Sequence, residues 1–236
     1  GDVVQLGDTP AYTFKLEPAN ARGVTRLDEL RGRPVLVEFW GTRCPTCVAG
    51  AVPAALRLQE TFGDELQVVF VEAQGAGSDT ALAFALARKW LGGQALWTSE
   101  APFRVPGNML PKVVLLDSEG RVVLVGQPLD QSKEIERLVG EEISAQRSPP
   151  VSAPLSVRPA WTEFARGRVA RAFELLDGVL ASPRTEGDPG RAREDDRVDA
   201  ARAAREQMTA ALTREFERVA RLVRAASYDE AETRLA

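Results

Sequence analysis

Short apolar runs alternate with helical repeats along residues 1–147. Continuous apolar runs of strand length, which favour a buried sheet, occupy residues 34–40, 66–71, 112–117 and 121–126. Apolar side chains recur at helical spacing over residues 45–62, 79–91 and 130–145. Residues 12–16 are predicted to form a short edge strand, and Ser118-Glu119-Gly120 a tight turn between the last two strands. This order predicts an α/β fold with a mixed central sheet and helices on both faces.

The pattern changes at Ser148. Four prolines follow between residues 148 and 159, which is typical of a semi-rigid linker. Residues 160–236 carry only helical patterns, with an apolar stripe over 161–181 and a long helix from about 191 to 226. We therefore expect an α/β domain over 1–147, a Pro-rich linker over 148–159 and a small all-α helical domain over 160–236.

The helical domain resembles tetratricopeptide-type repeats at a few positions. Gly167, Ala172 and Pro183 match the small-residue and terminal-proline spacing of such a repeat, and Ala226–Ala231 looks like the turn into another helix. A plain helical hairpin fits the same residues equally well. Because residues 160–236 contain neither cysteine nor histidine, we expect this domain to bind a protein partner or dock on the first domain, not to catalyse.

Composition narrows the class of protein. Apolar residues make up 44% of the 236 positions, which is enough for a real core. No run of 18 or more apolar residues is present, so no transmembrane span is predicted. The net charge of −4 argues against a nucleic-acid partner.

The only two cysteines are Cys44 and Cys47, directly after the apolar run 34–40 and at the start of a predicted helix. The first N–H groups and the dipole of a helix favour a thiolate there, which lowers the pKa of a thiol. A pair at this spacing is typical of a dithiol/disulfide redox centre, in which Cys44, the more exposed thiol, attacks and Cys47 resolves the mixed disulfide. Pro45 suits the first helical turn.

Two other interpretations of the cysteines stay open. With no histidine and no third cysteine, a zinc site within one chain would need carboxylate ligands, which is unusual, although a site shared across a dimer would not. A purely structural disulfide one turn apart would close a very small loop and stabilise little.

Several segments of the first 147 residues together resemble TlpA/ResA-type thioredoxin domains, which are extracytoplasmic thiol–disulfide oxidoreductases of bacteria. The resemblance covers residues 7–146 and rests on Gly7–Leu16, Leu27–Trp40, the Cys44–Cys47 pair and Pro111 with the hairpin behind it. It implies a thioredoxin fold and no cofactor beyond a redox-active Cys44–Cys47 disulfide. The implied partners are protein thiols and disulfides and a thiol–disulfide electron donor, membrane-bound in this family.

The resemblance also implies site residues. Glu38 matches a buried acid that lies beneath the second cysteine and assists its deprotonation; an acid inside an apolar strand is expensive to bury, and burial raises its pKa. Pro111 matches a cis-proline that faces the disulfide, with the backbone of Leu110 pairing with an extended substrate. Trp40, Pro45 and Thr46 are expected at the same substrate site.

Two residues depart from the family pattern. Arg43 stands where tryptophan is common and Lys112 where threonine is common, and a cation at either position would favour the thiolate and attract acidic substrates. Both residues fit equally well as solvated surface charges.

The resemblance favours a reductant over an oxidant. The alternative is a redox-inert thioredoxin-like scaffold whose helical domain binds a protein partner. The extracytoplasmic location, in the periplasm or at a membrane anchor, rests on the resemblance alone, because the chain shows no signal segment and its cysteine content fits the cytoplasm as well.

Overall fold

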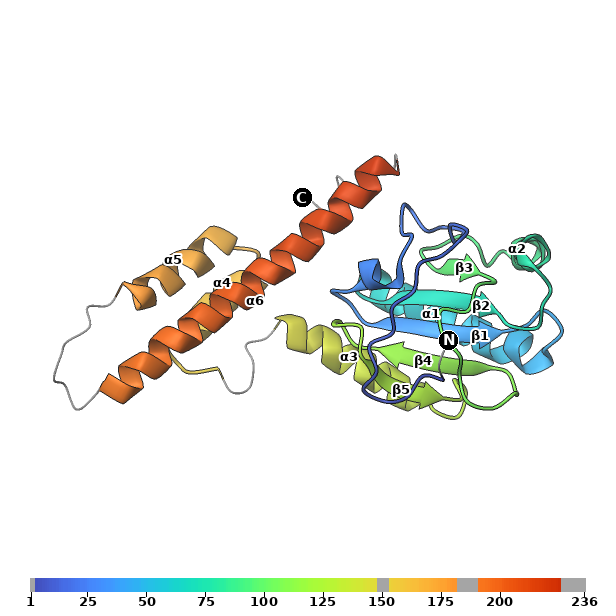
Figure 1. The fold of residues 1–236 in the computed structure, drawn as a ribbon, viewed down its shortest axis with the longest axis horizontal. Coiled ribbons are helices and arrows are strands. Elements are labelled where there is room, and N and C mark those ends of the chain that lie inside the picture. Colours follow the sequence, from blue (N-terminus) through green and yellow to red (C-terminus); the bar gives the residue numbers. More distant parts are fainter. Residues whose placement is uncertain (1–2, 148–152, 182–190, 226–236) are drawn as a thin grey trace. The chain divides into compact units, whose positions relative to one another are not determined.

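The computed structural model describes residues 3–147, 153–181 and 191–225 (Figure 1). The chain divides into two compact units: residues 1–142 with 217–236, and residues 143–216. The boundaries that the sequence suggests for the α/β domain, at residue 147, and for the helical domain, at residue 160, stay a prediction. Parts of two expectations lie outside the described residues, namely 148–152 of the linker and the repeat-like positions Pro183 and Ala226–Ala231.

The first unit is built on a five-stranded mixed sheet in the order β3-β2-β1-β4-β5 (Figure 1). Strand β1 pairs in parallel with β2 and antiparallel with β4, while β3 extends the parallel side and β5 the antiparallel side. This is the thioredoxin fold that the sequence predicts. The strands are β1 (Val35–Trp40), β2 (Gln67–Glu72), β3 (Leu96–Thr98), β4 (Lys112–Leu116) and β5 (Val122–Gly126).

Helices follow the strands in the expected order. A 3-10 turn η1 (Leu27–Leu30) precedes β1, and a π turn η2 (Cys47–Ala51) leads into α1 (Val52–Phe62). A second 3-10 turn η3 (Gly63–Glu65) ends that helix, and the remaining helices of this part are α2 (Ser78–Ala87) and α3 (Ser132–Arg147).

The two faces of the sheet carry different cores. Val35, Val37 and Phe39 of β1 belong to a buried cluster with residues of the N-terminal segment, among them Leu27 and Leu30. Side chains alternate along a strand, so Leu36, Glu38 and Trp40 lie on the opposite face. That face holds α2, since Phe84 contacts the Trp40 ring, and α1, which contacts β1 and β2 but contributes no residue to the first cluster.

Two elements differ from the sequence-based expectation. Residues 12–16 form a single bridge from Thr13 to Arg26 instead of an edge strand, because the backbone N–H groups of Lys15 and Leu16 donate to the Glu100 carboxylate. The sequence does not predict strand β3, because a strand of three residues is too short to show a periodic pattern. Its pairing with β2 defines it.

The helical part consists of α4 (Arg158–Ala165), α5 (Val169–Leu180) and α6 (Arg191–Arg224). The helix α4 begins inside the predicted linker. It ends at Ala165, and the positive φ of 75° at Gly167 lets the chain reverse before α5. The core of this part is made by Val157, Ala160, Trp161, Ala172, Leu176, Ala201, Ala204 and Met208. No helix among the described residues is long and apolar enough to span a membrane.

The helical core should be separable from the sheet by mutation. Leu176→Ala removes a side chain that is 0% exposed, and such truncations cost about 2–5 kcal/mol because a cavity remains. We expect hydrogen exchange measured by mass spectrometry to accelerate over residues 158–180 and to stay unchanged over 35–72. Leu86→Ala, at a side chain 65% exposed, is the control and should change neither region. Equal acceleration in both regions would contradict the division into two units.

Candidate active site

Cys44 and Cys47 form a disulfide at the carboxyl end of β1, with their Cα atoms 5.2 Å apart. The backbone N–H of Cys47 donates a hydrogen bond to Cys44 Sγ at 3.2 Å. Cys47 is fully buried, while Cys44 is 7% exposed. Only Cys44 therefore offers its sulfur to a second molecule. Among the described residues, no group of three or more histidine, cysteine, aspartate or glutamate side chains is placed to hold a metal ion.

The helix that carries the disulfide changes geometry at its second cysteine. Residues from Pro45 onward are helical, but Cys47–Ala51 form a π turn in which the Val52 N–H donates to the Cys47 carbonyl oxygen. Pro53 lies two residues after the end of this turn, lacks an N–H and crowds the carbonyl four residues earlier. Such a residue explains the wider turn. The apolar pattern predicts one regular helix over 45–62, and the π turn departs from this expectation, although Pro53 signals it.

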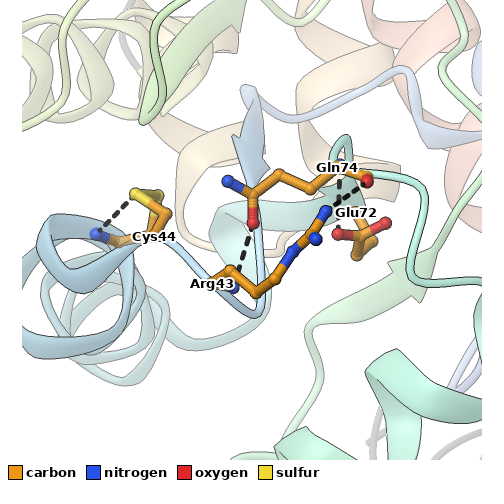
Figure 2. Close-up of a disulfide and its surroundings, with 5 residues drawn as sticks. Arg43, Cys44, Glu72 and Gln74 are labelled. Carbon is orange, nitrogen blue, oxygen red and sulfur yellow. Dashed lines mark hydrogen bonds between the residues drawn. A yellow bond between two sulfur atoms is a disulfide. The ribbon is translucent and has the colours of Figure 1, made fainter.

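The loop before Cys44 is tied to the loop after β2 (Figure 2). Gln74 Oε1 accepts from the Arg43 backbone N–H at 2.9 Å, and its carbonyl oxygen accepts from Arg43 Nη2 at 3.2 Å. The Glu72 carboxylate in turn accepts the backbone N–H groups of Gln74 and Ala76. Gly41 is required here, because a Cβ at this position would collide with the Gln74 side chain. These bonds fix the approach of the chain to Cys44.

Neither Glu72 nor Gln74 is among the site residues that the sequence predicts. Glu72 gave a usable signal, since an acid at the end of a fully buried strand needs partners. Gln74 gave none, because its contact with Gly41 joins two loops that are distant in the sequence.

Glu38 lies in the middle of β1, between Phe70 of β2 and Val113 of β4. Its side chain is 0% exposed, and neither carboxyl oxygen has a hydrogen-bond partner among the described residues. Burial disfavours the charged form and raises the pKa of Glu38 to about 8. The carboxyl is therefore neutral under mildly acidic conditions and titrates in the range where thiols do.

An open pocket of about 540 Å³ lies beside Cys44. Of the residues expected at the substrate site, Pro45, Thr46 and Leu110 line it, and the peptide bond between Leu110 and Pro111 is cis. The rest of the lining is Phe39, Arg43, Cys44, Ala73, Gln74, Val105, Gly107, Asn108 and Lys112. The geometry thus gathers the cysteine and the segment before Pro111 around one opening.

Trp40 differs from the expectation for a substrate-binding residue. It is 1% exposed and packs against Phe84, Trp90 and Trp97, with ring centroids 5.6–6.0 Å away. Its side chain lies on the sheet face that α1 and α2 cover, whereas alternation along β1 turns Phe39, which lines the pocket, to the opposite face.

The two cations near the site have different surroundings. The Arg43 side chain is exposed, and Figure 2 shows it directed toward Gln74 and Glu72. Lys112 is only 8% exposed, and its ammonium donates to the carbonyl oxygens of Pro106 and Gly107. Burial lowers the pKa of Lys112.

Solved structures similar to this chain include proteins described as thioredoxin-like and as thiol–disulfide proteins. One described as the thiol:disulfide interchange protein DsbE from Chlorobium tepidum is 22% identical, with a TM-score of 0.44 over 58% of this chain and 97% of the other. A thiol-disulfide isomerase from Corynebacterium glutamicum is 21% identical, with a TM-score of 0.44 over 61% and 96%. A protein described as a thioredoxin from Neisseria meningitidis is 18% identical, with a TM-score of 0.44 over 57% and 92%. No protein-family model and no curated protein matches the chain.

The burial of Glu38 predicts a pH-dependent stability. The carboxyl ionises near pH 4.5 when unfolded and near 8 in the folded protein, so between these values the native state holds one proton more. Stability should therefore fall as the pH rises through this window and level off above it, by at most about 5 kcal/mol. Glu38→Gln removes this proton, so the variant should gain stability relative to the parent protein between pH 5 and 9.

Denaturant unfolding of the oxidised protein across this pH range measures the effect. Glu60→Gln, at an exposed position of α1, is the matched control and should follow the parent protein at every pH. A Glu38→Gln variant whose stability also parallels the parent protein would contradict the raised pKa.

Proposed function

We propose that this chain is a thiol–disulfide oxidoreductase that exchanges a Cys44–Cys47 dithiol/disulfide with protein substrates. The observation that carries the proposal is the pairing of a partly accessible Cys44 with a fully buried Cys47 at the start of a helix, beside an open pocket. A structural crosslink would not need a pocket at one sulfur, and it would stabilise little across so short a loop.

The reaction has two exchange steps. The Cys44 thiolate attacks one sulfur of a substrate disulfide, and the other substrate sulfur leaves as a thiolate. The Cys47 thiolate then attacks Cys44 Sγ, which releases the first substrate sulfur and re-forms the Cys44–Cys47 disulfide. Two electrons pass from the protein dithiol to the substrate, and the two released thiolates take up the two protons of the dithiol. The N–H of Cys47, which donates to Cys44 Sγ, supports the thiolate form of Cys44.

Glu38 is the proton acceptor for Cys47 in this scheme. A general base works best when its pKa lies near the working pH, and burial brings the pKa of Glu38 to about 8. Because Cys47 is fully buried, water does not reach its thiol directly. Glu38 lies on the sheet face that α1 covers, so a proton relay through this face is the route that the fold offers.

The direction we propose is reduction of substrates. A thiol–disulfide donor must then return two electrons and two protons to the Cys44–Cys47 disulfide after each turnover. We place this cycle outside the cytoplasm, with the donor at the membrane, on the strength of the TlpA/ResA-type residues in the sequence. No cofactor other than the disulfide enters the scheme.

The order of attack predicts which variant traps a substrate. Cys47→Ser leaves the attacking thiol without its resolving partner, so mixed disulfides through Cys44 should accumulate when the variant meets a disulfide-bonded protein such as insulin. Cys44→Ser should trap at least about tenfold less, because Cys47 is buried. Non-reducing electrophoresis and mass spectrometry identify the adducts, and the double variant provides the background. Equal trapping by both single variants would reverse the assignment, and a parent protein without exchange activity would leave the scaffold interpretation.

The role proposed for Glu38 predicts that Glu38→Gln slows only the second exchange step, the attack of Cys47 on the mixed disulfide. Glu38→Gln cannot accept a proton, so release of the trapped substrate by Cys47 should slow by about 10²–10⁴-fold near neutral pH. The first step, formation of the mixed disulfide, should keep its rate. Stopped-flow measurement of both steps separates them, with Glu60→Gln as the control, and a uniform loss in both steps would assign Glu38 a purely structural role.

A further inference from the structure

Lys112 is a buried cation at the mouth of the site, and the part of the chain that the structure describes offers it no counter-ion. Its side chain is 8% exposed, although lysine is almost never buried unless it is paired. Among the described residues, no carboxylate forms an ion pair with it. Its two acceptors are the carbonyl oxygens of Pro106 and Gly107.

These two bonds leave the ammonium incompletely satisfied. A lysine ammonium has three N–H donors, and two of them account for the two carbonyls. The carbonyls are neutral dipoles, so the net positive charge remains. Gly107 has a positive φ of 77°, and a Cβ there would lie 3.3 Å from Lys112 Nζ, so the loop holds the ammonium closely.

The position of this charge is set by the sheet. Lys112 pairs with Phe39 at the carboxyl end of β1, and both residues line the pocket that contains Cys44. Two cations and no acidic side chain occur among the residues that line this pocket. Glu72 precedes the lining residues Ala73 and Gln74, and it directs both carboxylate oxygens to backbone N–H groups of its own loop.

Of the two cations, Arg43 attracts a substrate carboxylate less strongly than Lys112 does. Its guanidinium donates to the Gln74 carbonyl oxygen, and the side chain extends away from the disulfide (Figure 2). It is exposed, so solvent and salt screen its charge more than that of Lys112.

We propose that Lys112 is a specificity-determining residue that binds a carboxylate next to the reacting cysteine of a protein substrate, so that the protein selects acidic segments. This proposal rests on the function proposed above and names the substrate class of the same site. A protein segment fits the opening better than a small thiol does, because the exposed Met109 side chain, 75% accessible, adds apolar surface beside Leu110.

The chemical step is unchanged by this recognition. The substrate carboxylate contacts the Lys112 ammonium, which brings the substrate sulfur to Cys44. The Cys44 thiolate then forms a bond to that sulfur while the sulfur's former partner leaves as a thiolate, and Cys47 completes the two-electron exchange as described.

Short peptides with a single cysteine test the proposal. The cysteine is carried as a mixed disulfide with 2-mercaptoethanol and is flanked by Asp, Asn or Lys, with both termini blocked. The reduced protein reacts with each peptide, and the second-order rate constant is divided by that of dithiothreitol with the same peptide. This ratio removes the effect of the flanking charge on the intrinsic reactivity of the disulfide.

We expect the parent protein to prefer the Asp peptide over the Asn peptide by about fivefold and to discriminate further against the Lys peptide, as one partly screened charge pair allows. Lys112→Met should bring the Asp/Asn ratio close to one. Lys112→Arg should keep most of the preference. The control Lys133→Met removes the same charge from α3, outside the pocket, and should keep the parent ratio. Arg43→Gln should lower the ratio less than Lys112→Met.

Two results would overturn the proposal: an Asp/Asn ratio near one in the parent protein, or a ratio that survives Lys112→Met. If Lys112→Met does not fold, the salt dependence of the parent protein decides, since the Asp preference should fall as the ionic strength rises. A protein that reduces all peptides without preference loses only the carboxylate site. A protein that reduces none of them contradicts the oxidoreductase function itself.

Discussion

The hydrogen bonding of β1 on both edges is the constraint on which the site depends. All six residues of β1 are buried, and the strand pairs with β2 along its full length and with β4 from Val35 to Phe39. The register of Phe39 with Lys112 brings the segment around Leu110 beside the end of β1, where the chain turns into Cys44. Pairing on both edges fixes the register of β1. Residues that are far apart in the sequence therefore meet at one pocket.

The same strand fixes the acid of the site. A shift of one residue would move Glu38 from the helix-covered face to the other face, so the register of β1 also determines where its carboxyl lies. Burial without a hydrogen-bond partner is unfavourable for a carboxylate, and the fold tolerates it because the group remains protonated up to a pKa of about 8. A destabilising feature at the centre of the sheet is thus the one that suits proton transfer to a buried thiol.

Local patterns predicted most of the fold, and contacts between distant loops account for what they missed. The long apolar runs and the Cys44–Cys47 spacing are local signals, and the strands and the disulfide follow them. The short strand β3 and the bonds of Gln74 to Arg43 depend on partners elsewhere in the chain, which no local pattern reveals. Trp40 shows the limit of family resemblance, because its place in the core follows from strand alternation and not from its proximity to Cys44. Lys112 could be recognised as unusual from the sequence, but its burial and its two carbonyl partners required the structure.

The coupling between Glu38 and Cys47 can be measured directly by infrared difference spectroscopy of the carboxyl group. The spectra of the oxidised and the reduced protein are recorded across pH 5–10, and Glu38→Gln identifies the band. If Glu38 accepts the Cys47 proton, the oxidised protein should show a protonated carboxyl that titrates near pH 8, and reduction should shift this midpoint because two groups then share the titration. A Glu38 that is already ionised at pH 6, or whose midpoint is the same in both redox states, would contradict the central claim.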